Sequence, residues 1–112
     1  MGSYVIGMDY GTLSVRGVVA DPFTGKLLCE AVEVYPHGIL TQVGGKALPG
    51  DYALEHPEDY RQCMKKVVSR LLERVDPQDI CGIGMDFTSA TVVALDENME
   101  PLCNAPEFAD HP

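Results

Sequence analysis

The feature that most constrains this chain is a polar run between two short apolar segments near its start. The run Gly-Met-Asp-Tyr-Gly-Thr-Leu-Ser-Val-Arg covers residues 7–16, and residues 4–6 and 17–20 flank it. Two apolar segments joined by a turn with glycine and hydroxyl residues predict an antiparallel β-hairpin. Peptide N–H groups and hydroxyls in such a turn can face an anion without any bulk positive charge. The run predicts a phosphate-binding hairpin, with an ordinary hairpin turn as the plainer alternative.

The polar residues of this run suit different parts of a metal–nucleotide site. The donors for phosphate would come from the turn, which consists of Gly11, Thr12, Leu13 and Ser14. Arg16 would add a planar guanidinium that matches phosphate oxygens. Asp9 would repel phosphates unless a cation stood between them, and Mg²⁺ is the usual cation for one or two carboxylates. We therefore expect ATP with Mg²⁺ at this hairpin, with Asp9 as the metal ligand.

The spacing of this run resembles the first phosphate motif of the FGGY carbohydrate kinases, which belong to the superfamily of actin and the sugar kinases. A second segment, Gly-Ile-Gly-Met-Asp-Phe-Thr-Ser-Ala-Thr at residues 82–91, is similar to the ribulokinase branch, as are residues 35–38, 54–60 and 106–108. This resemblance implies an enzyme that transfers the γ-phosphate of ATP to a ketopentose, namely L-ribulose at its 5-hydroxyl. Another pentulose or polyol kinase and a non-catalytic actin-like nucleotide-binding domain remain as alternatives.

The second segment places polar groups at the end of an apolar strand, where they line a ligand crevice or cap a turn. The resemblance implies the first role, a part of the sugar pocket, for Phe87, Thr88, Ser89 and Ala90. In the family, the aspartate that acts as general base comes much later in the chain than residue 112. We therefore expect residues 1–112 to be the N-terminal portion of the first kinase domain, without a catalytic residue and inactive alone. A self-contained small binding module is the competing interpretation.

The order of apolar patterns predicts an α/β fold. Apolar alternation and turn residues predict three antiparallel strands at residues 4–9, 15–20 and 27–35, followed by a long loop at residues 36–51. Apolar residues at steps of three and four predict one amphipathic helix, from Pro57 to the Asp76-Pro77 pair. Two more strands are expected, at residues 80–85, parallel to the first, and at residues 91–95. The resemblance implies a ribonuclease-H-like half domain with a five-stranded mixed sheet.

The alternation in the third strand includes Leu28, either Ala31 or Val32, and Val34 among its apolar positions. Three of the four cysteines, Cys29, Cys63 and Cys81, fall within apolar patterns, which predicts buried reduced thiols. His37 and His56 have no evident acidic partner or metal spacing in the sequence, so we interpret both as structural.

Charge and composition exclude several classes of partner. The formal net charge of −9 argues against a nucleic-acid ligand, because such binding depends on Lys and Arg. A single nucleotide is compatible with this charge, because local amides, one arginine and a metal can hold it. The sequence shows no membrane-spanning run and no secretory signal, so we expect a cytoplasmic protein. Its partners would be the sugar and ATP, and a homo-oligomer is left open.

Overall fold

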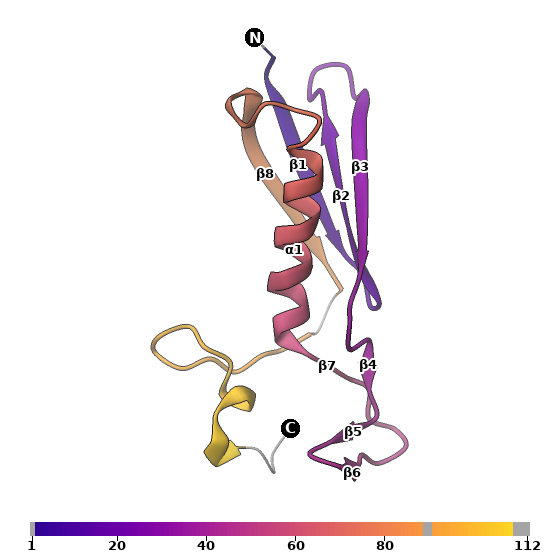
Figure 1. The fold of residues 1–112 in the computed structure, drawn as a ribbon, viewed down its shortest axis with the longest axis vertical. Helices are drawn as coiled ribbons and strands as arrows, with labels where there is room; N and C mark the ends of the chain where they lie inside the picture. The colour runs from indigo at the N-terminus through magenta and orange to yellow at the C-terminus, as the bar shows by residue number, and fades with distance from the viewer. Residues whose placement is uncertain (1, 89–90, 109–112) are drawn as a thin grey trace.

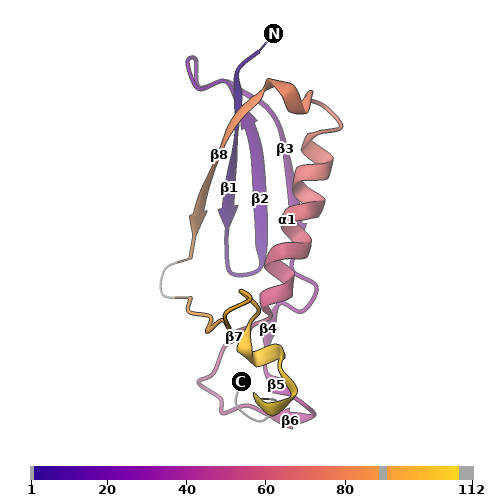
Figure 2. The same ribbon diagram turned by 90° about the vertical axis from the view of Figure 1, so that its left-hand side faces the viewer.

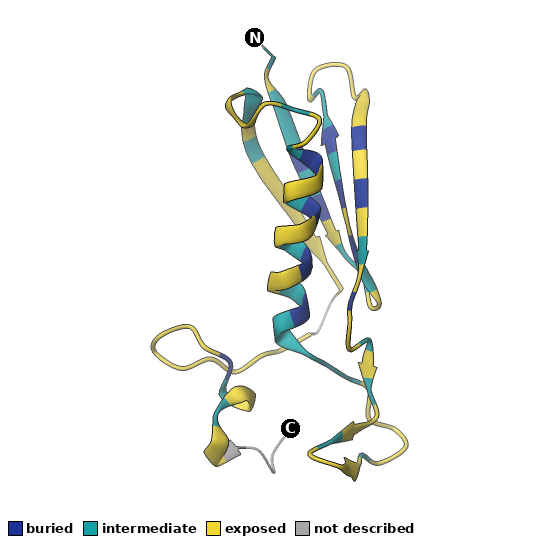
Figure 3. Cartoon of the chain, viewed as in Figure 1, coloured by how far each residue is buried: buried dark blue, intermediate teal, exposed yellow. Residues whose placement is uncertain are grey.

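The computed structural model describes residues 2–88 and 91–108, which form a sheet–helix body and a set of connecting loops (Figure 1). The sheet–helix body comprises residues 4–35 and 57–87, and the connecting loops comprise residues 36–56 and 91–108. Figure 3 shows that burial concentrates between the helix and the sheet. The buried hydrophobic residues of the described chain are Ile6, Met8, Val15, Val19, Cys29, Ala31, Tyr35, Cys63, Val67 and Leu71.

Four strands form the sheet of the body, in the order β3-β2-β1-β8. The strands β1 (Tyr4–Tyr10), β2 (Ser14–Ala20) and β3 (Leu27–Val34) follow one another in antiparallel pairing, as predicted. The strand β8 (Ile80–Phe87) pairs in parallel with β1, which confirms the expected parallel partner. A parallel pairing requires a long crossover connection, and the helix supplies it.

The helix α1 (Pro57–Leu71) covers one face of the sheet and packs on β2 and β3 (Figure 2). Its start follows the sequence rules, because proline takes the first helical position and the His56 side chain caps the Glu58 N–H at 3.2 Å. Close packing depends on Gly17 in β2. A Cβ atom there would lie 2.4 Å from Val67 Cγ1, so the missing side chain lets the helix approach the strand.

The pleat of the sheet separates the residues of β1 into two sets. Ile6 and Met8 are buried beneath α1, whereas Asp9 is exposed on the opposite face, which we call the open face. No described element covers the open face, so polar residues there meet solvent. The predicted hairpin therefore contributes to the core with one side and to a polar surface with the other.

The connecting loops contain four very short strands where a long loop was predicted. The strand β4 (Ile39–Leu40) pairs with β7 (Leu54–Glu55), and β5 (Gln42–Val43) pairs with β6 (Lys46–Ala47). Three short 3₁₀ helices complete the description: η1 (Pro77–Asp79), η2 (Leu102–Asn104) and η3 (Pro106–Phe108). Within the described residues, no helix is long and apolar enough to cross a membrane.

Three expectations about the fold are wrong: a strand at residues 91–95, the length of the helix and the burial of Cys81. Residues 91–95 form no strand, and only an isolated bridge joins Leu95 to Pro101, so the described sheet has four strands and not five. The helix ends at Leu71 instead of continuing to Asp76, and hydrogen-bonded turns follow it. In the third strand, Cys29 and Ala31 face the core. Burial there depends on what α1 covers, and apolar residues beyond its reach remain exposed.

These exposed apolar residues include Leu28 and Val34 of β3, which point to the open face. Cys81 of β8 is also exposed, contrary to prediction, because α1 packs on β2 and β3 and leaves the edge strand uncovered. Cys29 and Cys63 are buried as free thiols, as predicted. Burial raises the pKa of the Cys63 thiol, and the nearby Asp59 and Glu33 carboxylates raise it further.

Candidate functional site

Three charged residues form a row across the open face, at the end of the sheet nearest the hairpin turn. Asp9 of β1 lies in register with Arg16 of β2 on one side and with Asp86 of β8 on the other. All three are exposed, and neighbouring strands lie about 4.8 Å apart. Asp9 thus has a second carboxylate and a guanidinium as its cross-strand neighbours. Carboxylate oxygens open to solvent are the donors that Mg²⁺ takes, with water completing its shell.

The hairpin turn beside this row has an unusual pattern of backbone hydrogen bonds. The Gly11 N–H donates to the Ser14 carbonyl at 2.8 Å, but the Gly11 carbonyl accepts from the Tyr35 hydroxyl at 2.9 Å. The peptide N–H groups of Thr12, Leu13 and Ser14 donate no hydrogen bond to another described residue. The turn therefore presents three consecutive unpaired donors, the kind of arrangement that binds anions.

Gly11, the first residue of the turn, lets two backbone segments lie close together and does not adopt an unusual backbone angle. Gly11 is not among the residues with positive φ, whereas Gly25 and Gly38 are. A Cβ atom on Gly11 would lie 3.3 Å from the Ser14 carbonyl oxygen, which is tighter than ordinary contact. The turn thus closes at Gly11 without the left-handed conformation that many glycine turns require.

Phe87 and Thr88, two of the predicted sugar-pocket residues, lie on the other side of the sheet. Phe87 is in register with Tyr10, and their rings contact at a centroid distance of 6.4 Å. Both the N–H and the hydroxyl of Thr88 donate to the Tyr10 carbonyl, each at 3.1 Å. Thr88 therefore ties the end of β8 to the hairpin. Ser89 and Ala90 lie outside the described residues.

Two adjoining cavities open below this end of the sheet. The larger has a volume of about 810 Å³ and is lined by Thr12, Thr88, Tyr60 and apolar residues of the connecting loops. The smaller, of about 290 Å³, is lined by Gly11 and Phe87 among others, and it shares Tyr60 and Thr88 with the larger. A large, mostly apolar pocket with a few convergent hydroxyls is the usual form of a small-molecule site.

The structure brings the two predicted sites together only in part. Thr12 of the turn and Thr88 at the end of β8 line one cavity, so the predicted phosphate and sugar residues meet there. Asp9 and Arg16 line neither cavity, because the pleat directs them to the open face. A ligand that used both sets would have to reach across the hairpin turn, which lies between the two faces.

Comparison with known proteins finds relatives of this chain. Ribulokinase 1 of Staphylococcus saprophyticus is 40% identical over 98% of this chain and 21% of its own length. The ribulokinase of Geobacillus thermodenitrificans is 41% identical over 97% of this chain and 20% of its own. The chain is similar to ribulokinases, and its structural neighbours are FGGY-type sugar kinases. It matches their N-terminal part and spans about one fifth of their length.

Solved structures give the same assignment. A xylulose kinase and a gluconate kinase, both from Lactobacillus acidophilus, each superpose with a TM-score of 0.72 at 25% identity. Each superposition covers 89% of this chain and 18% of the neighbour. No family model matches the sequence. The mixed sheet with its covering helix therefore fits an actin- and sugar-kinase-like fold.

Sequence reasoning missed the aromatic residues that support the site. Tyr35 is buried at the end of β3, and Tyr60 of α1 contacts its ring edge-to-face at 5.4 Å. The Tyr60 hydroxyl donates to the Glu55 carboxylate, and Tyr10 contacts the Tyr60 ring at 5.9 Å. Burial, with the charge of Glu55, raises the pKa of both Tyr35 and Tyr60. A tyrosine that ends an apolar strand was the available signal, because its polar tip requires a partner.

His37 has an acidic partner that the sequence did not show. His37 Nδ1 lies 2.7 Å from the buried carboxylate of Asp59, which also accepts the His37 backbone N–H at 3.0 Å. The rings of His37 and His56 stack at 4.2 Å. Their nitrogens and the Asp59 carboxylate lie within 4.8 Å of one another, close enough to be considered as a metal site. His56 Nδ1, however, accepts the Glu58 N–H, so its neutral ring carries its proton on Nε2 and offers no lone pair there.

Proposed function

We propose that this chain forms one binding surface of an ATP-dependent pentulose kinase, with L-ribulose as the acceptor. One observation carries the proposal: the row of Asp86, Asp9 and Arg16 lies directly beside a turn with three unpaired N–H groups. Phosphates require donors and positive charge, and a carboxylate at the same place requires a cation between it and the phosphates. The likeness to ribulokinases over the whole chain supports the choice of reaction.

In this proposal the residues have distinct roles. Thr12, Leu13 and Ser14 bind phosphate oxygens through their N–H groups, and Arg16 offsets the remaining negative charge. Asp9 holds Mg²⁺, and the exposed carboxylate of Asp86 gives the donor set a second oxygen ligand. When bound, Mg²⁺ neutralises charge that develops on the phosphates during transfer. Thr88 and Phe87 lie where the cavity meets the hairpin, so the sugar hydroxyl would approach from that side.

We further propose that residues 1–112 are the N-terminal portion of the first kinase domain and that the general base lies elsewhere in the enzyme. Phosphoryl transfer depends on positioning and charge neutralisation by groups around both substrates. One such surface should bind nucleotide weakly. We therefore expect no tight Mg-ATP binding and no kinase activity from the 112 residues alone.

The test is a coupled kinase assay of the complete polypeptide that its gene encodes. L-ribulose, D-ribulose, ribitol and xylulose are compared as acceptors, and L-ribulose should give the highest kcat/KM. If another of these acceptors gave a higher kcat/KM, the kinase activity would stand and L-ribulose would be rejected as the preferred substrate. ATP binding without turnover of any sugar would favour the non-catalytic nucleotide-binding domain. Tight Mg-ATP binding by the 112 residues alone would favour a self-contained module.

Substitution of the metal ligand tests the site itself. Asp9→Asn in the complete polypeptide should reduce kcat by about a hundredfold or more, because the amide cannot supply the carboxylate charge. The matched control is Glu30→Gln, which removes a carboxylate from the same open face. Glu30 lies on β3, two residues from Val32, the residue in register with Arg16. Equal activity of the two variants would reject the assignment of Asp9.

A further inference from the structure

Tyr35 holds the hairpin turn at two points from the end of the neighbouring strand. Its hydroxyl donates to the Gly11 carbonyl at 2.9 Å, and its backbone N–H donates to the Leu13 carbonyl, also at 2.9 Å. Its side chain is only 3% exposed, so these bonds are shielded from competing water. Two carbonyls of a four-residue turn are thereby turned toward one buried residue.

These two hydrogen bonds change which backbone groups of the turn have a hydrogen-bond partner. In an ordinary two-residue hairpin, Gly11 and Ser14 would exchange two hydrogen bonds, one in each direction. Here only the Gly11 N–H to Ser14 carbonyl bond is present, and the Gly11 carbonyl binds the Tyr35 hydroxyl instead. The Ser14 N–H therefore has no partner among the described residues. Carbonyl oxygens that would repel an anion are occupied, and N–H groups that would attract one are open.

The surroundings keep Tyr35 in place and in its donating form. The Tyr60 ring packs edge-to-face on it, with an interplanar angle of 85°. Burial and the charge of Glu55 raise the pKa of the Tyr35 hydroxyl, so it remains protonated near neutral pH. A protonated hydroxyl that faces a carbonyl acts as a hydrogen-bond donor. Because Tyr35 is buried, its hydroxyl and not water occupies the Gly11 carbonyl.

We propose that Tyr35 is a positioning residue of the phosphate-binding turn: it occupies the Gly11 carbonyl and so leaves the Ser14 N–H available to an anion, beside the N–H groups of Thr12 and Leu13. The identity of the anion rests on the proposed function. The unbonded state of the Ser14 N–H does not. Tyr35 itself contacts no phosphate in this arrangement. It acts through the backbone of the hairpin.

The first test needs no ligand. In Tyr35→Phe, the Ser14 N–H becomes the nearest donor for the released Gly11 carbonyl, and the bond should close. Amide hydrogen exchange at Ser14, followed by NMR on the isotopically labelled chain, should slow by roughly tenfold or more. Tyr52→Phe is the matched control, since Tyr52 lies in a connecting loop and is 48% exposed. Unchanged Ser14 exchange in a folded Tyr35→Phe protein would overturn the proposal.

The second test uses magnesium tripolyphosphate as the probe, titrated at millimolar concentration. The wild-type amides of residues 12–14 should shift, and Tyr35→Phe should weaken the interaction about five- to tenfold, the equivalent of one hydrogen bond. Equal affinity of the two proteins would reject the role of Tyr35 alone. No shift in the wild type would reject the phosphate site, whereas the effect of Tyr35 on the turn would still be decided by the exchange rate of the Ser14 amide. Thermal unfolding of each variant confirms that the comparison is made between folded proteins.

Discussion

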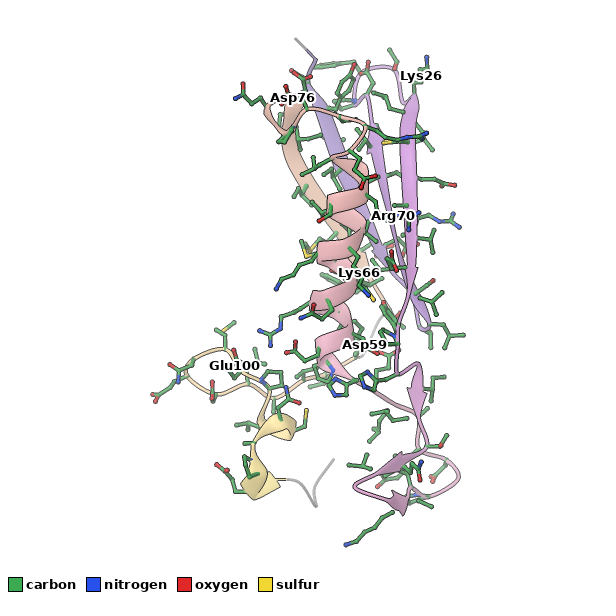
Figure 4. All side chains as sticks on the ribbon, in the orientation of Figure 1. Lys26, Asp59, Lys66, Arg70, Asp76 and Glu100 are labelled. Carbon is green, nitrogen blue, oxygen red and sulfur yellow. The ribbon has the colours of Figure 1, made fainter. Side chains whose placement is uncertain are left out.

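The sheet–helix body and the connecting loops differ in what keeps them in place. In the body, α1 and three strands bury a continuous core, whereas Pro101 is the one buried residue among the described connecting loops (Figure 3). The loops are attached by polar contacts instead, such as His37 to Asp59 and Arg61 to Glu100 at 3.3 Å. Figure 4 labels Asp59 on α1 and Glu100 in the connecting loops. Apolar burial is the main favourable contribution to folding, while exposed ion pairs contribute little.

The difference matters because the candidate site lies where the two regions meet. The hairpin turn and the charged row belong to the body, and most of the wall of the larger cavity belongs to the loops. A rigid hairpin beside a loosely attached wall would suit the proposed site, which must admit a substrate and then enclose it. Three measurements would break or sharpen this comparison.

Thiol accessibility should show the largest contrast. Cys63 is 1% exposed in the body, and Cys103 is exposed in the connecting loops. If Cys63 reacts only through global opening, its labelling by a disulfide reagent should be about a thousandfold slower or more than that of Cys103. Single-cysteine variants assign each rate. Similar rates for the two thiols would show that the body opens as readily as the loops.

A matched truncation should give the next largest effect. Leu71→Ala removes a side chain that is 1% exposed, and we expect it to lower the free energy of unfolding by about 2–5 kcal/mol. Leu95→Ala makes the same change at a position that is 43% exposed in the loops, and it should cost under about 1 kcal/mol. Urea unfolding measures both. Equal losses would mean that the loops share the cooperative core.

The smallest of the three effects concerns the polar attachment of the first loop to α1. Asp59 is 3% exposed and binds both the backbone N–H and the ring of His37. Asp59→Asn retains the shape but removes the charge, and should cost about 1–2 kcal/mol. Asp51→Asn, at an exposed loop position, is the control and should have no measurable effect. If Asp59→Asn had no effect on stability, the contact between Asp59 and His37 would not be what attaches the first loop to α1.

Much of the body could be predicted because its signals are local. Alternation of apolar residues located the three antiparallel strands, and Pro57 with the periodic apolar residues after it located the helix. The predicted strand at residues 91–95 was wrong, because an apolar run forms a strand only where another strand pairs with it, and no strand of the described sheet pairs with these residues.

The candidate site was predictable in its residues but not in its arrangement. Asp9 and the turn were identified from spacing and resemblance, yet the sequence did not indicate that Asp86 would lie in register beside Asp9. Register between strands separated by a helix is determined by packing of the whole body. The acidic partner of His37 was missed for the same reason, since Asp59 follows it by 22 residues.

By itself, the sequence determined the main elements of the body and the polar groups that residues 7–16 carry, because periodicity and residue type act over a few neighbouring positions. Only the tertiary structure decided which groups of that hairpin are free. The Gly11 carbonyl is occupied because Tyr35, 24 residues away, is buried within reach of it. Hydrogen bonding in a buried site is a competition among all nearby donors and acceptors, and folding alone determines which of them are near.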